Sequence, residues 1–138
     1  MKLGKRLKRI TLTILAALYS TGVIVWLLNY FLRADRGFGL EPSPARVIWL
    51  ELHSVISLGF LILFGYLLHA HLRPAWRRGK KLKSGVSLTV VISVLIFTVP
   101  ILFYSTNESF KASVAAIHTY VGLAAAAFFL VHYFTKKN

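Results

Sequence analysis

Five histidines are the residues with the clearest capacity for chemistry in this chain of 138. All of them lie within long apolar stretches, and they are His53, His69, His71, His118 and His132. An ionisable side chain is costly to place inside a membrane, so each of these histidines is a candidate functional residue. The structural alternative is a histidine that bonds to a neighbouring helix or lies at the membrane interface. The interfacial alternative fits His69 and His71, which lie near the end of their stretch.

The spacing of His118 and His132 indicates that both side chains face the same way. They are fourteen positions apart, which on an ideal α-helix corresponds to roughly 21 Å along the axis and a rotation of about 40°. Gly122, Ala125 and Phe129 lie on the same stripe, where small residues would let a bulky planar group approach the helix. Two neutral imidazoles from facing helices suit a haem iron, for which imidazole is a standard axial ligand.

Four long apolar runs must position these histidines, and 57% of the residues are hydrophobic. The runs cover about residues 10–32, 47–72, 86–104 and 112–134. Each approaches or exceeds the roughly 20 residues that span a bilayer core as a helix. The first is longer than the apolar part of a cleaved signal peptide, so we expect it to remain as a helix. Because the connections are short, the sequence predicts an all-α integral membrane four-helix bundle, up-down-up-down, as a single domain over residues 1–138.

The charged residues are distributed unevenly between the ends of these runs. Of the 17 lysines and arginines, thirteen lie in the segments 2–9, 73–83 and 136–137, which contain no acidic residue. The other four share the opposite side with all four acidic residues. The positive-inside rule then predicts that both termini and the loop at 73–85 are cytoplasmic. This topology and contact with anionic lipid account for the net charge of +13, so we expect a lipid bilayer and no nucleic acid among the partners.

The depth of each histidine predicts two ligand pairs. The second and fourth runs cross the membrane in the same direction, and His53 and His118 each lie a few residues into their runs. We therefore expect these two to meet near the outer side. His132 lies near the inner end of its run, level with His69 and His71, so the second pair is expected near the inner side.

The choice between His69 and His71 as the inner ligand depends on the helix phase. On an ideal helix His69 points about 160° away from His53, whereas His71 returns to the same face. The distance along the axis from His53 to His71 is roughly 27 Å, longer than the separation of the two histidines in the fourth run. A bulge near Gly59 or Gly65 would instead rotate His69 inward. We expect His71 to be the ligand, with His69 as the alternative.

The segment from His118 to His132 reads HTYVGLAAAAFFLVH, with an H-x13-H spacing and Gly122 four residues after the first histidine. In this feature the chain resembles the bacterial di-haem b-type cytochrome membrane subunits with a four-helix core, and residues 83–132 resemble them most. The resemblance implies two b haems per chain and a place in the bacterial inner membrane. It also implies a larger redox complex, with electrons exchanged with quinone or with a periplasmic or cytoplasmic electron-transfer protein. The family pattern would place the fourth ligand at Leu67, where this chain has no histidine.

Other residues complete the set of candidates. The chain has no cysteine, which excludes thiolate metal sites, iron–sulfur clusters and c-type haem attachment. Glu51 beside His53 could accept protons at a quinone pocket, or it is a solvated interfacial carboxylate. Arg73, Arg77 and Lys80 could pair with the propionates of an inner haem, or they are the cationic flanks of a membrane helix.

The sequence thus predicts a transmembrane electron-transfer subunit of an oxidoreductase rather than an enzyme by itself, because it contains no catalytic motif. The haem would carry the redox chemistry, while the protein supplies ligation, dry surroundings and orientation. Two alternatives remain. One is a haem-free membrane anchor or assembly subunit with structural histidines, and the other is a small transporter or metal-handling protein with histidines along a path.

Overall fold

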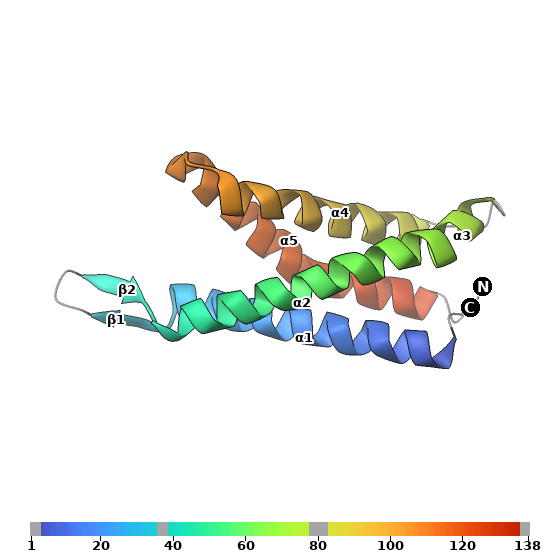
Figure 1. The fold of residues 1–138 in the computed structure, drawn as a ribbon, viewed down its shortest axis with the longest axis horizontal. Coiled ribbons are helices and arrows are strands. Elements are labelled where there is room, and N and C mark those ends of the chain that lie inside the picture. Colours follow the sequence, from blue (N-terminus) through green and yellow to red (C-terminus); the bar gives the residue numbers. More distant parts are fainter. Residues whose placement is uncertain (1–3, 36–38, 78–82, 136–138) are drawn as a thin grey trace. The chain divides into compact units, whose positions relative to one another are not determined.

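The four expected apolar helices are present in the structure, a computed structural model that describes residues 4–35, 39–77 and 83–135. The helical elements in Figure 1 are α1 (Lys5–Tyr30), α2 (Ala45–Leu67), η1 (Leu68–Leu72), α3 (Arg73–Arg77), α4 (Lys83–Tyr104) and α5 (Glu108–Thr135). Within the described ranges, four helices are long and apolar enough to cross a membrane; the second combines α2 with the helical residues up to Ala75. The prediction of an all-α protein with four such helices is confirmed.

The helices extend beyond the apolar runs at their amino-terminal ends. The expected ranges 10–32, 47–72, 86–104 and 112–134 start two to five residues too late. Lysine, arginine and glutamate are good helix formers, so the helix continues outside its apolar part, as at Lys5 and Glu108. α1 ends at Tyr30, two residues early, because the chain turns there towards a strand. An apolar run therefore marks the stretch that fits a bilayer core rather than the whole helix.

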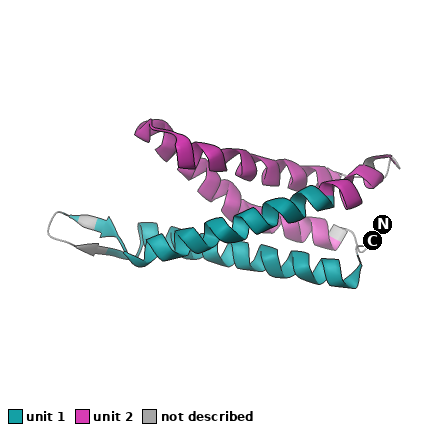
Figure 2. Ribbon diagram, in the orientation of Figure 1, with its two compact units in different colours: residues 1–67 teal, residues 68–138 magenta. Residues whose placement is uncertain are grey.

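The chain divides into two compact units, residues 1–67 and residues 68–138, which Figure 2 shows in different colours. In the first unit α1 packs against α2, and in the second α4 packs against α5. Each pair is an antiparallel helical hairpin. We call the end at which the chain connects the two helices the loop end of a hairpin, and the opposite end its open end.

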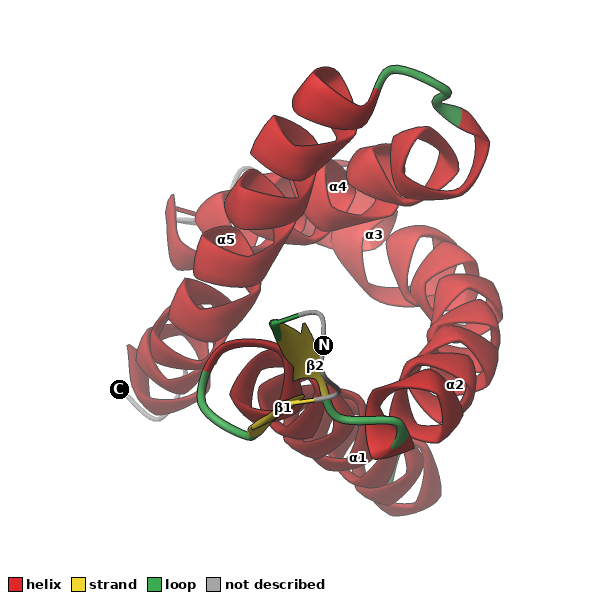
Figure 3. Ribbon diagram, turned by 90° about the vertical axis from the view of Figure 1, so that its left-hand side faces the viewer, coloured by secondary structure: helices red, strands yellow, loops and turns green. Residues whose placement is uncertain are grey.

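The first hairpin closes through two short strands, the yellow arrows in Figure 3. β1 (Arg33–Asp35) pairs antiparallel with β2 (Leu40–Pro42), and Arg33 lies opposite Pro42. Gly39 leads into β2 with a φ of +115°, a backbone conformation that favours glycine. The sequence predicted only a connection here, because strands of three residues are too short to show an alternating pattern.

The second hairpin closes through residues 105–107. The side-chain oxygen of Asn107 accepts a hydrogen bond from the backbone N–H of Phe110 at 3.0 Å, so this asparagine caps the amino terminus of α5. The cap satisfies one of the N–H groups that have no partner within the helix. It fixes the start of α5 at Glu108, four residues after the end of α4 at Tyr104, and thus helps to set the register between the two helices.

The segment that carries His69 and His71 is a π-helix, η1 (Leu68–Leu72), which continues α2. A π-helix has hydrogen bonds between residues i and i+5 and is frequently found at functional sites. The sequence suggested a bulge near Gly59 or Gly65 as one way of turning His69 inward. The structure places the irregularity further along, beginning three residues after Gly65.

The helices bury few side chains and present large apolar ones outward. The buried apolar side chains among the described residues are Leu28, Phe60, Phe64 and Val114. By contrast, Ile62 is 79% exposed and Phe97 is 75% exposed. Apolar surface of this extent is unfavourable in water and is well accommodated by lipid chains. Together with the length of the helices, it makes the chain a multi-pass membrane protein in contact with a lipid bilayer.

Candidate functional site

His53 lies in α2 near the loop end of the first hairpin and is bonded to α1. Its Nδ1 atom is 3.0 Å from the hydroxyl oxygen of Thr21. The Thr21 side chain is buried, with 5% of its surface exposed, and the imidazole is half-buried. The same hydroxyl lies 2.9 Å from the carbonyl oxygen of Ala17 and 3.0 Å from that of Leu18. The histidine is thus linked through one hydroxyl group to the backbone of α1.

The contacts of the Thr21 hydroxyl group favour one tautomer of the neutral His53 ring. A hydroxyl group has one proton to donate and two lone pairs with which to accept. The Thr21 hydroxyl donates its proton to a carbonyl oxygen of α1, so it is an acceptor towards the imidazole. Nδ1 of His53 then carries the proton and donates it, which leaves a lone pair on Nε2. This is a form in which a histidine binds a metal ion or a haem iron.

His118 in α5 has the same arrangement in the second hairpin. Its Nδ1 atom is 2.6 Å from the hydroxyl oxygen of Thr98 in α4, and that hydroxyl donates to the carbonyl oxygen of Leu95 at 2.7 Å. Thr98 is buried, with 8% of its surface exposed. The Nδ1–H group of His118 is therefore the donor, and Nε2 keeps its lone pair. Each hairpin thus has one histidine in the ligand form near its loop end.

His132 lies near the open end of the second hairpin and has a more distant hydroxyl partner. Its Nδ1 atom is 3.4 Å from the hydroxyl oxygen of Ser84 in α4, which is long for a hydrogen bond between these groups. The imidazole is half-buried. His132 therefore shares the pattern of a hydroxyl partner on the neighbouring helix, with a looser geometry than His53 and His118.

Two of the imidazole rings pack against a glycine of the neighbouring helix. A Cβ atom on Gly22 would lie 3.1 Å from Cε1 of His53, and a Cβ atom on Gly85 would lie 3.4 Å from Cε1 of His132. The hydroxyl residue directly before each glycine faces Nδ1 of the same ring. The ring edge therefore occupies the space that a side chain would otherwise fill, beside the group that orients it.

Replacement of Gly22 with alanine is expected to displace the His53 ring. The added carbon would lie 3.1 Å from Cε1, and overpacking of this kind costs about 1–3 kcal/mol. The matched control is Gly59→Ala in α2, where an added Cβ atom meets nothing within 4 Å and helix propensity favours alanine by about 1 kcal/mol. Thermal unfolding of the detergent-solubilised protein, followed by circular dichroism, measures the difference. A Gly22→Ala protein that is as stable as Gly59→Ala would contradict the packing argument.

The two remaining histidines lie in η1 and differ in exposure. His69 is exposed, whereas His71 is half-buried and its Nδ1 atom is shielded from solvent. The expected inner ligand is thus the more enclosed of the two. The pairing of either residue with His132 stays a prediction. So does the pairing of His53 with His118, which belong to different units.

The other charged candidates lie on the surface where they are described. Glu51, Arg73 and Arg77 are exposed, and Lys80 lies outside the described residues. Within residues 4–35, 39–77 and 83–135, no group of three histidine, aspartate or glutamate side chains converges. The candidate site consists instead of separate imidazoles, three of which have a hydroxyl partner on the neighbouring helix.

Comparisons with protein-family models, curated proteins and solved structures find no match for this chain. The histidines and the groups that surround them are therefore the features of the chain that bear on its function.

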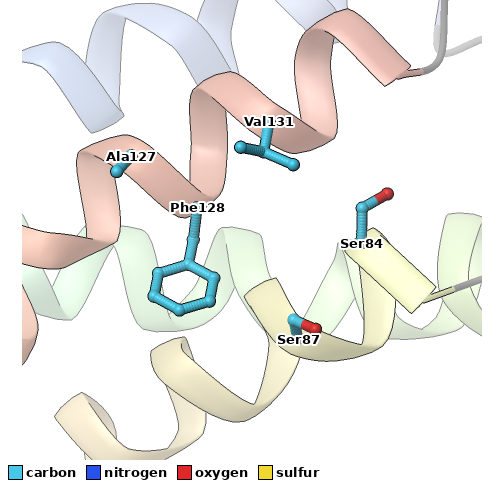
Figure 4. Close-up of a pocket in the computed structure, with 5 residues that line it drawn as sticks. All are labelled: Ser84, Ser87, Ala127, Phe128 and Val131. Carbon is cyan, nitrogen blue, oxygen red and sulfur yellow. The ribbon is translucent and has the colours of Figure 1, made fainter.

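A cavity of about 230 Å³ lies between the helices of the second hairpin. Figure 4 shows its lining residues, which are Ser84 and Ser87 of α4 and Ala127, Phe128 and Val131 of α5. The cavity is smaller than the roughly 300–1,000 Å³ that is typical of small-molecule sites. It borders the Ser84 side chain that faces His132, but its size alone does not indicate a ligand.

The hydroxyl partners of the histidines, Thr21, Thr98 and Ser84, were not predicted from the sequence. Two of them have a local signal, a hydroxyl residue directly before a glycine inside an apolar helix, as in Thr21-Gly22 and Ser84-Gly85. Thr98 is followed by valine and has no such signal. It is recognised only once the register between α4 and α5 is known.

Proposed function

We propose that this chain is a membrane cytochrome b subunit that transfers electrons across the bilayer through two b haems, each held by two histidines. The observation that supports this most is the hydrogen bonding of His53 and His118. In both, a threonine hydroxyl that donates to its own helix accepts a bond from Nδ1, so Nε2 keeps its lone pair. A histidine that holds a haem iron through Nε2 needs this form, and the bond at the other nitrogen orients the ring.

The set of donor groups suits haem better than a single metal ion. The chain has no cysteine, and no three histidine or acidic side chains converge within the described ranges. A protein zinc ion usually takes three or four side-chain ligands. A haem would need only two histidines from the chain to hold its iron, because the macrocycle binds the iron as well. Separate imidazoles with individual hydrogen-bond partners fit that requirement.

The proposed ligands are His53 and His118 for one haem, and His132 with His71 for the other, with His69 as the alternative to His71. The pairing follows from the depth of each histidine in its apolar run and from the H-x13-H resemblance to di-haem b-type cytochrome subunits. The haems, when bound, supply reversible one-electron chemistry. The residues of the chain bind the iron, hold the imidazole rings through hydroxyl groups and exclude water with apolar helices.

The charge distribution supports an orientation in the bacterial inner membrane with both termini in the cytoplasm. Cationic side chains lie at the open ends of the hairpins, and they include Lys5, Arg6, Arg73, Arg77 and Lys83. The positive-inside rule assigns these ends to the cytoplasmic side, where the cations can contact anionic lipid or haem propionates. The partners in this proposal are quinone or an electron-transfer protein within a larger redox complex.

A visible difference spectrum of the detergent-purified protein, dithionite-reduced minus oxidised, tests the proposal. We expect a b-type α-band, and a pyridine haemochrome assay is expected to give two haems per chain. Circular dichroism provides the control that the helices are intact. A purified protein that has intact helices but contains no haem, after expression under haem-replete conditions, would contradict the proposal.

The same spectrum decides on the main alternative, a haem-free membrane anchor or assembly subunit. The observation in its favour is that His53, His118 and His132 each face a hydroxyl group across their own hairpin. Hydrogen bonds of this kind also join membrane helices that carry no cofactor. A colourless, folded protein would support the anchor.

A further inference from the structure

We propose that the second hairpin binds an anionic phospholipid in the groove between α4 and α5, with the lipid phosphate at Lys83 and part of one acyl chain in the groove. The groove is the cavity of Figure 4, and all of its lining residues belong to the unit of residues 68–138. The site does not depend on bound haem. It gives one lipid a defined place, beyond the general contact of apolar helices with the bilayer.

The groove is polar at the open end of the hairpin and apolar further along the helices. Figure 4 shows its two serines, Ser84 and Ser87, near the start of α4, and its apolar side chains, Ala127, Phe128 and Val131, on α5. Ser84 directly precedes the apolar part of α4, so it lies where the headgroups of a bilayer meet the hydrocarbon core. A phospholipid has the same order of a polar end followed by an apolar chain.

The cation of the proposed site is Lys83, which is exposed. The hydroxyl group of Ser87 donates to the carbonyl oxygen of Lys83 at 2.9 Å. The two residues are four positions apart, so their side chains lie on the same side of α4, with Lys83 one turn closer to the open end. A lysine at the end of a membrane helix can extend its ammonium group to the level of the headgroups.

The charges at the open end of the second hairpin favour an anionic lipid over a zwitterionic one. Arg73, Arg77 and Lys83 are exposed there. The only acidic residue in the sequence from 68 to 138 is Glu108, which begins α5 at the opposite, loop end. A zwitterionic headgroup brings its own cation and leaves the surplus of positive charge in place, whereas an anionic headgroup neutralises it.

The size and the opening of the groove suit an acyl chain. Its volume is about 230 Å³, so it can hold only part of a lipid. Ser87, Ala127 and Phe128 are exposed, so the groove opens to the side of the hairpin, where the rest of the lipid would lie. Two of these side chains are small, and an acyl chain beside them would restore the van der Waals contacts that an empty groove lacks.

The test is a lipid titration of the detergent-purified protein, in which native mass spectrometry counts the bound lipids. We expect one phosphatidylglycerol to bind more tightly than those that follow, and phosphatidylcholine to show no such first site. Lys83→Gln removes the charge and is expected to weaken binding at this site about fivefold. Ser87→Leu fills the groove and is expected to abolish the preference. Glycerol phosphate, which has no acyl chain, is expected not to compete.

The matched controls lie at the loop end of the same hairpin. Lys111→Gln removes a cation from the first turn of α5. Ser113→Leu replaces an exposed serine whose hydroxyl group donates to the carbonyl oxygen of Ser109 at 3.1 Å, four residues earlier, as Ser87 does in α4. Both control variants are expected to bind phosphatidylglycerol as the wild-type protein does, with equal helix content by circular dichroism.

Three outcomes would overturn the proposal. One is equal binding of phosphatidylglycerol and phosphatidylcholine by the wild-type protein. Another is a first site that persists unchanged in Lys83→Gln and Ser87→Leu, which would place the lipid elsewhere. The third is a Ser87→Leu protein that unfolds at a lower temperature while the wild-type protein binds no lipid at this site, which would show that another helix fills the groove. None of these measurements depends on haem content, so the proposed function and this site can fail separately.

Discussion

Replacement of His118 with alanine is expected to lower the haem content from two per chain to one and to halve the reduced α-band. The reason is that an iron with one remaining imidazole loses half of its protein ligands, and no other histidine lies within thirteen residues of His118 on α5. A pyridine haemochrome assay on the purified variant measures the loss of haem per chain. Ile117→Ala, at a neighbouring position that is 50% exposed, is the control and is expected to keep both haems.

The partner substitutions make this expectation specific. His53→Ala is expected to remove the same haem as His118→Ala, so the double variant should resemble either single variant. His132→Ala is expected to remove the other haem, and its combination with His118→Ala should leave none. Two haems retained in His118→Ala, or a different haem lost in His53→Ala, would show that His53 and His118 do not hold the same haem.

Replacement of His71 with alanine is expected to remove the haem assigned to His132 and His71, whereas His69→Ala is expected to keep both haems. The two residues are neighbours in η1, so a change in the π-helical backbone would affect them alike. They differ in that His71 is half-buried, with Nδ1 shielded from solvent, and His69 is exposed. We therefore expect the enclosed imidazole, rather than the exposed one, to bind the haem.

The pair of variants serves as its own control, since each removes one imidazole from the same segment. Haem content and the reduced spectrum should be compared at equal protein concentration and equal helix content. Loss of a haem in His69→Ala with retention in His71→Ala would reverse the ligand assignment. It would also mean that the π-helical segment turns His69 inward when haem is bound.

The helices and the candidate histidines could be predicted because the signals are local. A run of apolar residues long enough for a bilayer core predicts a membrane helix, and a histidine within it, such as His53 or His118, is conspicuous. The boundaries were less predictable, because residues such as Lys5 and Glu108 extend a helix without adding to its apolar run. The helix therefore extends past the last residue that would contact lipid.

The groups that hold the histidines could not be predicted, because they depend on register. Thr21 and Ser84 at least precede a glycine, but Thr98 is an ordinary hydroxyl residue in an apolar helix, as Thr89 is. Which of them faces an imidazole is decided by the connection between the helices and by side-chain packing, both of which are properties of the folded hairpin. The π-helical form of η1 was missed for a similar reason, since a shift of backbone hydrogen bonds leaves no mark in the residue types.

The two hydroxyl contacts in the second hairpin are separated by the same number of residues on both helices. Ser84 and Thr98 are fourteen apart on α4, as His118 and His132 are on α5. The two contacts therefore depend on one register between α4 and α5. A shift of one helix along the other would break both contacts at once. One residue inserted between Ser84 and Thr98 would turn one hydroxyl by about 100°, although every histidine would remain. The separation of His118 and His132 along α5 is thus matched by the hydroxyl residues of a second helix.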